Sequence, residues 1–345
     1  MFSKNLRFYR LCRGMTKKEL SQKCDITSMA ISNYENGHRK PTMDILKRLA
    51  VVLGVSVSDF LAVRDENILF EHGEFRKNSS LSERQQEYIR ESIEEYFNRF
   101  MNIVEILGGK ILPDSPSCHV LPLSKDIDYN ALYLREHLGF SKDGPIEDLI
   151  GKLENKGILI YECNIDNDKF SGMNGLINSR PYIVINVNMS AERNRSTIVH
   201  ELAHLMFSWP SDMSNNKIEK IATAISGAFL FSKSDAFREL GVRRTAITSD
   251  MLLVAAEYGI SMLLLAKRAR ICNIINDKAE RDFYIRASQM GWRNSEPQRI
   301  DKEKATLFRQ LVYRAVSEKE IAIAKGAELL KESLEVVEKN SSKLD

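Results

Sequence analysis

The sequence predicts an α+β protein that is mostly helical, and three observations support this fold class. Apolar residues recur at helical spacing along most of the chain, beginning with five short helix patterns near the N-terminus. Only residues 158–163 and 182–187 have the β-rich composition of strands, so we expect a small sheet. The length, 345 residues, is enough for two or three domains.

The composition is that of an ordinary globular protein. Hydrophobic residues make up 43% and charged residues 28%, which excludes extended disorder and collagen-like fibres. No apolar run approaches the ~20 residues of a membrane span, and the basic N-terminus lacks the apolar core of a secretory signal. The five cysteines are scattered without a C-x-x-C pair. We therefore expect a cytoplasmic protein with reduced thiols and no contact with a membrane.

Charge is distributed unevenly between the first helices and the remainder. Residues 1–61 contain 11 Lys and Arg against 5 acidic residues, whereas the whole chain has a net charge of only +3. A basic N-terminal segment on a mildly acidic body is typical of a protein whose head binds a polyanion. Charge alone does not distinguish nucleic acid from a merely solvated basic face.

The N-terminal helices have clear start and stop signals. Thr16 and Glu19 have capping-box spacing, a second short helix ends at Asn36, and Pro41-Thr42 opens a third. Five short helices in about 60 residues, two of them joined by a tight turn, form a helix-turn-helix plan.

The second helix of that pair is the candidate recognition helix. Short polar side chains on its outer face suit base edges in the major groove, and basic side chains flank it at positions that could hold phosphates. The alternative is a solvated helix in a protein-binding bundle. The candidate base contacts are Thr27, Ser28, Met29, Ser32 and Asn33, and the candidate phosphate contacts are Arg10, Lys17, Asn36, Arg39 and Lys40.

Helices are expected to connect this head to the sheet and to form the tail. Residues 71–80 are polar and predict a connection, and residues 82–107 predict one long amphipathic helix. Residues 113–128 contain three prolines and predict a loop. Further helices are expected at 131–138, 145–156, 301–316 and 318–338.

The sharpest chemical signal is the string His200-Glu201-Leu202-Ala203-His204, an H-E-x-x-H motif. On a helix, two histidines four residues apart lie on one face and can bind one Zn²⁺, with the glutamate as general base. The alternative is two chance histidines on a buried helix. Apolar neighbours and Ser190 as a possible N-cap favour the helix.

The third metal ligand is less clear from spacing. Glu219 lies on the next expected helix, beside its apolar stripe, and Ala222 one turn later leaves room for a neighbouring helix. Asp212, Asp235 and Glu239 are competing candidates. Residues 182–187 could form an exposed strand that pairs with an extended substrate, or an ordinary sheet strand.

The head resembles an Xre/Cro-type helix-turn-helix. The similarity rests on Met15-Thr16-x-x-Glu19-Leu20, on Ile31-Ser32-x-Tyr34-Glu35-Asn36-Gly37 and on Leu49-Ala50-x-x-Leu53-Gly54. Asp25 departs from the glycine that this family usually has in the turn. The resemblance implies binding to a double-stranded DNA operator as a homodimer.

The body resembles the ImmA/IrrE family of metallopeptidases. The similarity rests on Phe170-Ser171-Gly172, on Arg195-x-Thr197-x-x-His200-Glu201-x-x-His204, on Glu219-x-x-Ala222 and on Tyr258-Gly259-Ile260-Ser261. The resemblance implies zinc bound by His200, His204 and Glu219, with Glu201 as the base. Thr223, Ile225-Ser226 and Phe231-Ser232 depart from the family pattern.

Together these features predict four regions and one leading function. The regions are a five-helix DNA-binding domain at 1–65, a helical connector and loop at 66–125, a zincin-like peptidase domain at 126–290 and a helical region at 291–345. The leading function is a DNA-binding transcriptional regulator that cleaves a protein partner such as a repressor. One alternative is a regulator or antitoxin-like protein whose zincin domain senses a ligand or partner without proteolysis. Another is a peptidase whose head docks proteins.

Overall fold

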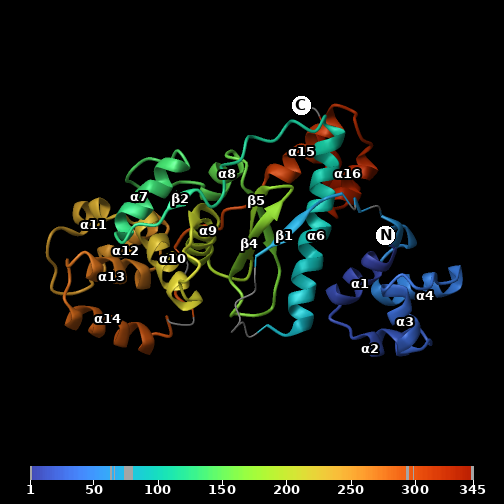
Figure 1. The fold of residues 1–345 in the computed structure, drawn as a ribbon, viewed down its shortest axis with the longest axis horizontal. Helices are drawn as coiled ribbons and strands as arrows, with labels where there is room; N and C mark the ends of the chain where they lie inside the picture. The colour runs from blue at the N-terminus through green and yellow to red at the C-terminus, as the bar shows by residue number, and fades with distance from the viewer. Residues whose placement is uncertain are drawn as a thin grey trace. The chain divides into compact units, whose positions relative to one another are not determined.

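The computed structural model describes residues 2–62, 64–65, 67–73, 81–292, 295–297 and 299–342. They form an α+β fold that is mostly helical, as the sequence predicts, and the chain divides into two compact units. Unit 1 comprises Met1–Phe70, Phe75–Ile111 and Arg309–Asp345, and unit 2 comprises Glu71–Glu74 and Leu112–Phe308 (Figure 1). Unit 2 is therefore inserted into the sequence of unit 1.

Unit 1 begins with the five expected short helices. They are α1 (Phe2–Cys12), α2 (Lys17–Lys23), α3 (Ser28–Glu35), α4 (Met43–Leu53) and α5 (Val57–Leu61). Thr16 and Glu19 form the predicted capping box at the start of α2. Asp25, in the turn between α2 and α3, has φ 50°, a left-handed conformation that Asp tolerates better than most residues. The departure from glycine at this position therefore leaves the turn intact.

Four further helices belong to unit 1. They are α6 (Glu83–Ile106), α15 (Leu307–Ser317), whose first two residues fall in unit 2, α16 (Ile323–Leu330) and α17 (Leu334–Ser341). Lys331, after α16, joins them to the head, because its Nζ lies 2.9 Å from Glu95 Oε1 of α6 and 4.6 Å from the centre of the Phe8 ring of α1. Arg99 of α6 also donates to the carbonyl of Leu329. The tail thus packs within the same unit as the DNA-binding candidates.

Unit 2 contains a four-stranded sheet in the order β1-β4-β5-β3 and a small β2-β6 pair. The strands are β1 (Phe70–His72), whose first residue falls in unit 1, β2 (Leu121–Pro122), β3 (Leu159–Cys163), β4 (Gly172–Ile177), β5 (Arg180–Asn186) and β6 (Phe207–Ser208). β5 pairs parallel with β3 and antiparallel with β4, with Asn174 opposite Ile183.

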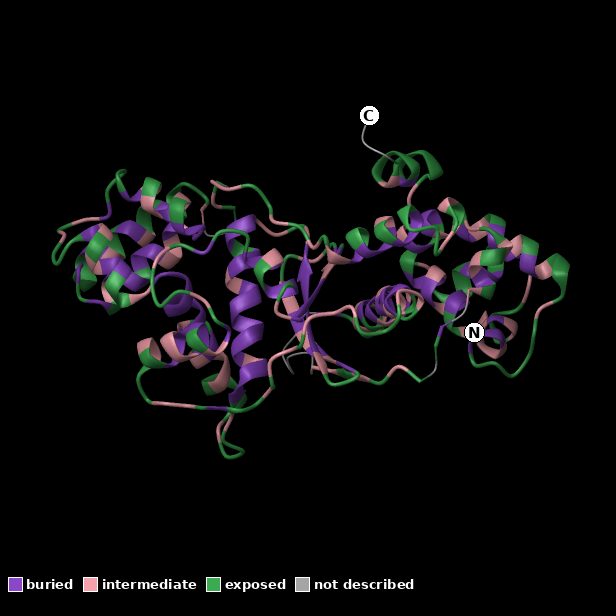
Figure 2. Cartoon of the chain, turned by 90° about the horizontal axis from the view of Figure 1, so that it is seen from above, coloured by how far each residue is buried: buried purple, intermediate pink, exposed green. Residues whose placement is uncertain are grey.

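Helices of unit 2 cover the sheet around α9 (Ala191–Met206), which contacts both β4 and β5 and is buried along most of its length (Figure 2). On its other side, α10 (Asn215–Leu230) packs against both α9 and α7 (Ile127–His137). The remaining helices are α8 (Leu149–Glu154), α11 (Lys233–Leu240), α12 (Met251–Tyr258), α13 (Met262–Ile271) and α14 (Asp277–Gln289). This arrangement places α9 in the centre of the core.

Several expected elements differ from those in the structure. The strand at 182–187 is not an exposed edge, because β5 has neighbours on both sides and Tyr182–Ile185 are at most 1% exposed. The expected helix at 145–156 is only α8, since its N-cap Asp148 has φ 44°. The expected helix at 301–316 begins at Leu307, and that at 318–338 is divided into α16 and α17 at Lys331, which has φ 56°. Of the polar connection at 71–80, residues 74–80 lie outside the described residues.

Among the described residues, we find no helix that combines the length and apolar character needed to cross a membrane.

Candidate metal centre and nucleic-acid interface

Helix α9 holds the H-E-x-x-H motif in the interior of unit 2. Its N-cap is Ser190, as predicted, and the Ser190 side chain accepts a hydrogen bond from the backbone N–H of Arg193. His200 and Glu201 are buried, with 7% and 6% of their surfaces exposed. Because the motif is helical, His200 and His204 lie one turn apart on the same face.

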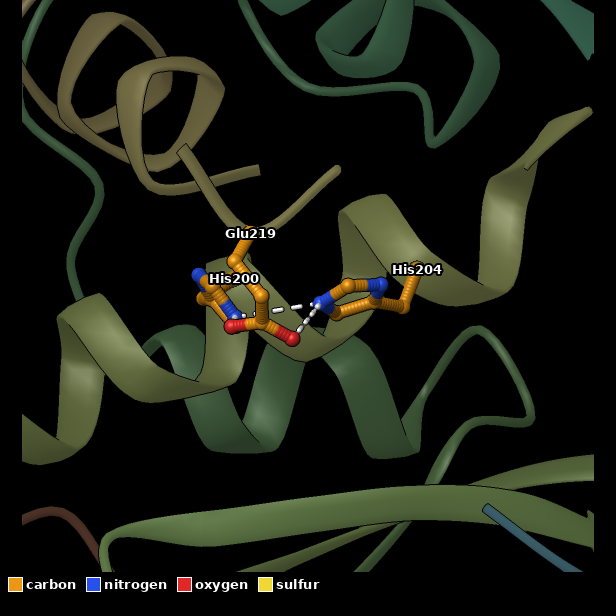
Figure 3. A group of neighbouring side chains, drawn as sticks. All are labelled: His200, His204 and Glu219. Carbon is orange, nitrogen blue, oxygen red and sulfur yellow. Dashed lines mark hydrogen bonds and ion pairs between the residues drawn. The ribbon is translucent and has the colours of Figure 1, made fainter. Parts of the chain in front are cut away.

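Glu219 of α10 meets both histidines (Figure 3). The Nε2 atoms of His200 and His204 are 3.1 Å apart, and the two carboxylate oxygens of Glu219 lie 3.3 Å from His200 Nε2 and 3.4 Å from His204 Nε2. All three ligand atoms lie within 4.8 Å of one another. Two imidazoles and a carboxylate converge here on one point.

The competing carboxylates have other surroundings. Asp235 is fully buried in a network with Ser232, the backbone N–H of Gly144 and Arg238, and Glu239 contacts Arg238 and Tyr258. Asp212 is exposed before α10. Within the described part of the chain, the only group of three His, Cys, Asp or Glu side chains close enough to hold a metal is His200, His204 and Glu219.

This donor set fits Zn²⁺. Two imidazole nitrogens and one carboxylate oxygen are the protein ligands of several catalytic zinc sites, at about 2.0–2.2 Å from the ion. Atoms at such distances around a tetrahedral ion are separated by about 3.4 Å. The two histidine Nε2 atoms are 3.1 Å apart, and each lies 3.3 or 3.4 Å from one oxygen of Glu219, which is close to that separation. His200 also has a partner for its second ring nitrogen, because Thr223 Oγ1 lies 3.2 Å from His200 Nδ1. Thr223, a departure from the family pattern, thus orients a candidate ligand.

Glu201 has a partner that the sequence did not indicate. Asn174 Nδ2, on β4, donates a 2.6 Å hydrogen bond to Glu201 Oε2. Asn174 lies 27 residues before Glu201, in a stretch whose glycines concealed the strand. No spacing rule connects two such positions, so only the fold brings them together.

In unit 1, the candidate DNA-contacting residues lie at and beside α3. Thr27, Ser28 and Met29 are exposed, Met29 by 69%, whereas Ser32 and Asn33 are partly buried. The Thr27 side chain accepts a hydrogen bond from the backbone N–H of Ala30, so it also caps α3. The start of α3 is thus the most accessible part of the face.

The flanking basic residues divide into two groups. Arg39, Lys40 and the amide residue Asn36 are exposed after α3, and Lys17 Nζ lies 3.4 Å from Ser32 Oγ. Arg10 is only 3% exposed. It donates to both oxygens of Glu35, at 2.9 Å for the second, and to the carbonyl of Met15. The expectation that Arg10 holds a phosphate is therefore wrong, because its guanidinium is occupied inside the helical core.

The two sites fall within two matches to known families. Residues 6–60 match the helix-turn-helix family model, and residues 153–270 match the model of the IrrE N-terminal-like domain, in the M78 peptidase family. No curated protein matches the chain. The chain is therefore a fusion of a helix-turn-helix domain and an IrrE-like peptidase-family domain, as its motifs predicted.

Proposed function

We propose that this fusion of a DNA-binding domain and a peptidase-family domain is a transcriptional regulator whose second domain is a zinc-dependent endopeptidase. Its substrate is a protein partner such as a repressor. The observation that carries the proposal is the convergence of the His200, His204 and Glu219 side chains, together with a buried glutamate, Glu201, next to His200 in the sequence. We assign DNA binding to residues 1–65 and peptide cleavage to residues 126–290, in a cytoplasmic protein.

The residues of unit 2 have distinct roles in this proposal. His200, His204 and Glu219 hold Zn²⁺, which when bound acts as a Lewis acid that polarises a carbonyl and lowers the pKa of water. Glu201 is the general base. Its Oε2 is held by Asn174, which fixes the rotation of the carboxylate, and we assign the transferred proton to Oε1.

Residues of unit 1 direct the protein to DNA. Thr27, Ser28, Met29, Ser32 and Asn33 face base edges in the major groove, and Lys17, Arg39 and Lys40 hold phosphates. Such a helix-turn-helix domain reads two half-sites when it forms a homodimer, which we include in the proposal.

The test is Glu201→Gln in the full chain. The glutamine retains an oxygen that accepts the Asn174 hydrogen bond but does not act as a base, so cleavage should fall by ~100- to 10,000-fold while zinc content stays unchanged. Cells that express each form would be compared for protein fragments that depend on zinc and on Glu201, and for transcription of the target genes. If the variant regulates those genes as the wild type does, proteolysis is not the function. A regulator whose zincin domain senses a ligand or partner is then the better description.

A further inference from the structure

Strand β4 carries Asn174, the hydrogen-bond partner of the candidate base Glu201. Strand β4 has β5 on one side, and its other side is paired with β1. The backbone N–H of Gly73, just after β1, donates to the carbonyl of Asn174 at 2.9 Å. Residues 71–74 belong to unit 2, so this pairing lies within that unit.

Asn174 connects this edge to Glu201. Its side chain donates to Glu201, and its backbone carbonyl accepts from Gly73. Only Asn174 therefore lies between the main chain of residues 71–73 and the Glu201 carboxylate. An exposed strand edge binds extended peptides through main-chain hydrogen bonds, which any sequence can supply. The β4 edge is the strand edge that an extended substrate would need in order to reach Glu201.

Two glycines let β1 approach this edge closely. A Cβ at Gly73 would lie 2.5 Å from the carbonyl oxygen of Asn174, and a Cβ at Gly175 would lie 2.5 Å from that of Glu71. The approach is reinforced by His72, whose Nδ1 is 2.7 Å from the hydroxyl of Tyr182 on β5. β1 has only three residues, few enough for another extended segment to replace it.

We propose that the β4 edge beside Glu201 is a binding site for an extended protein segment, and that residues 71–73 occupy it as an internal competitor. This inference rests on the proposed peptidase function and adds its regulation. The occupant lies in the sequence between α5 and α6, both of which belong to unit 1. The state of the peptide site is therefore covalently linked to the DNA-binding unit.

The experiment removes the occupant and offers it back as a separate peptide. The probe is a fluorescent peptide with the sequence of residues 67–73, NILFEHG, bound to the zinc-loaded full chain. In the wild type the probe competes with a tethered strand whose effective concentration is ~1 mM. Gly73→Ala places a methyl group against a backbone oxygen, so the strand should leave and the probe should bind at least ~10-fold more tightly.

Two further variants provide a control and an independent route. Glu71→Ala alters an exposed side chain of the same strand and leaves its main chain unchanged, so probe affinity should equal that of the wild type. Tyr182→Phe removes the hydroxyl that contacts His72 without changing β4, and probe affinity should rise as with Gly73→Ala. Zinc-dependent cleavage of an unfolded protein such as casein is measured on the same samples and should rise with probe affinity.

Each outcome has a definite meaning. Equal probe affinity in the wild type, Gly73→Ala and Tyr182→Phe overturns the inference. If the variants bind the probe more tightly but cleave casein no faster than the wild type does, the inference is also overturned, because the strand then does not block substrate. Tighter probe binding without cleavage by any zinc-loaded variant supports strand exchange at this edge and refutes the proposed peptidase function instead.

Discussion

The two helices that carry the candidate functions present their side chains in opposite ways. On α3 and its N-cap, Thr27, Ser28 and Met29 are exposed to solvent. On α9, His200 and Glu201 are buried, and neighbouring elements supply partners for both. A DNA-contacting surface requires only that the inner face of its helix packs against the rest of the domain. A metal centre also requires that neighbouring residues orient the ligand side chains. The two sites should therefore respond differently to substitution.

The two units also differ in what surrounds a buried carboxylate. Glu35, in the DNA-binding head, is paired with the buried guanidinium of Arg10. Glu154, in unit 2, accepts hydrogen bonds from the backbone N–H groups of Thr306 and Leu307. Burial raises the pKa of Glu154 to about 7, and those two hydrogen bonds offset the rise only in part. The charge of Glu35 is thus stabilised by an opposite charge, and that of Glu154 by backbone dipoles.

The largest effect should come from breaking the buried ion pair between Arg10 of α1 and Glu35 of α3. Arg10→Met keeps a long side chain but leaves Glu35 buried without its guanidinium, which should cost about 3–5 kcal/mol. Hydrogen exchange at the amides of α1 to α3 measures the loss. Arg39→Met, at an exposed position, is the control and should change exchange little. Equal exchange in the two variants would mean that the Arg10–Glu35 pair does not stabilise α3.

A second, slightly smaller effect should appear as pH dependence in unit 2. The raised pKa of Glu154 means that the folded state favours the protonated acid, so this contribution to stability is complete below about pH 4.5. It is lost as pH rises through about 7, at a cost of about 3 kcal/mol. Glu154→Gln should remove this dependence and stabilise unit 2 at pH 8 but not at pH 4. Unfolding curves at the two pH values test this, and a variant that is equally affected at both would contradict it.

Loss of one metal ligand should rank next. Even a hydrogen-bond partner of a ligand contributes 10- to 100-fold to zinc affinity, so Glu219→Ala should weaken binding by at least ~100-fold. Competition with a chromogenic chelator gives the affinity. Asp212→Ala is the matched control, since Asp212 is an exposed carboxylate nearby in the sequence. It is a better control than Asp235, whose burial makes its removal a folding defect. Zinc affinity that is the same in both variants would exclude Glu219 as a ligand.

The smallest effects should come from the candidate DNA-contacting residues of the head. Asn33→Ala should relax sequence preference by ~1–3 kcal/mol, whereas Lys40→Ala should weaken all sequences alike and lower the salt slope by about 1. Titration of operator and unrelated DNA at several salt concentrations separates the two. If both variants lose the same affinity on every sequence, Asn33 does not read a base.

The local signals in the sequence predicted the elements whose stability is local. The capping box of Thr16 and Glu19, the N-cap Ser190 and the helix around His200 were correctly predicted, because each depends on residues within a few positions. The mostly helical α+β class was correct for the same reason.

Features that depend on distant partners could not be predicted in this way. β4 contains Gly172, Asn174 and Gly175, which have low strand propensity, and it forms because β1 and β5 pair with it. The burial of Arg10 follows from a partner 25 residues later, in another helix. In both cases the sequence gives the residue types, and the fold determines what they contact.

Because unit 2 is inserted into the sequence of unit 1, cleavage of the backbone within unit 2 would not by itself separate the segments of unit 1. Both halves of unit 1 remain joined by Lys331 with Glu95 and Phe8, and by Arg99 with the carbonyl of Leu329. A single cut between Leu112 and Phe308 would therefore give two fragments on a denaturing gel and one particle under native conditions. Release of the DNA-binding head requires these contacts to be broken as well as a peptide bond.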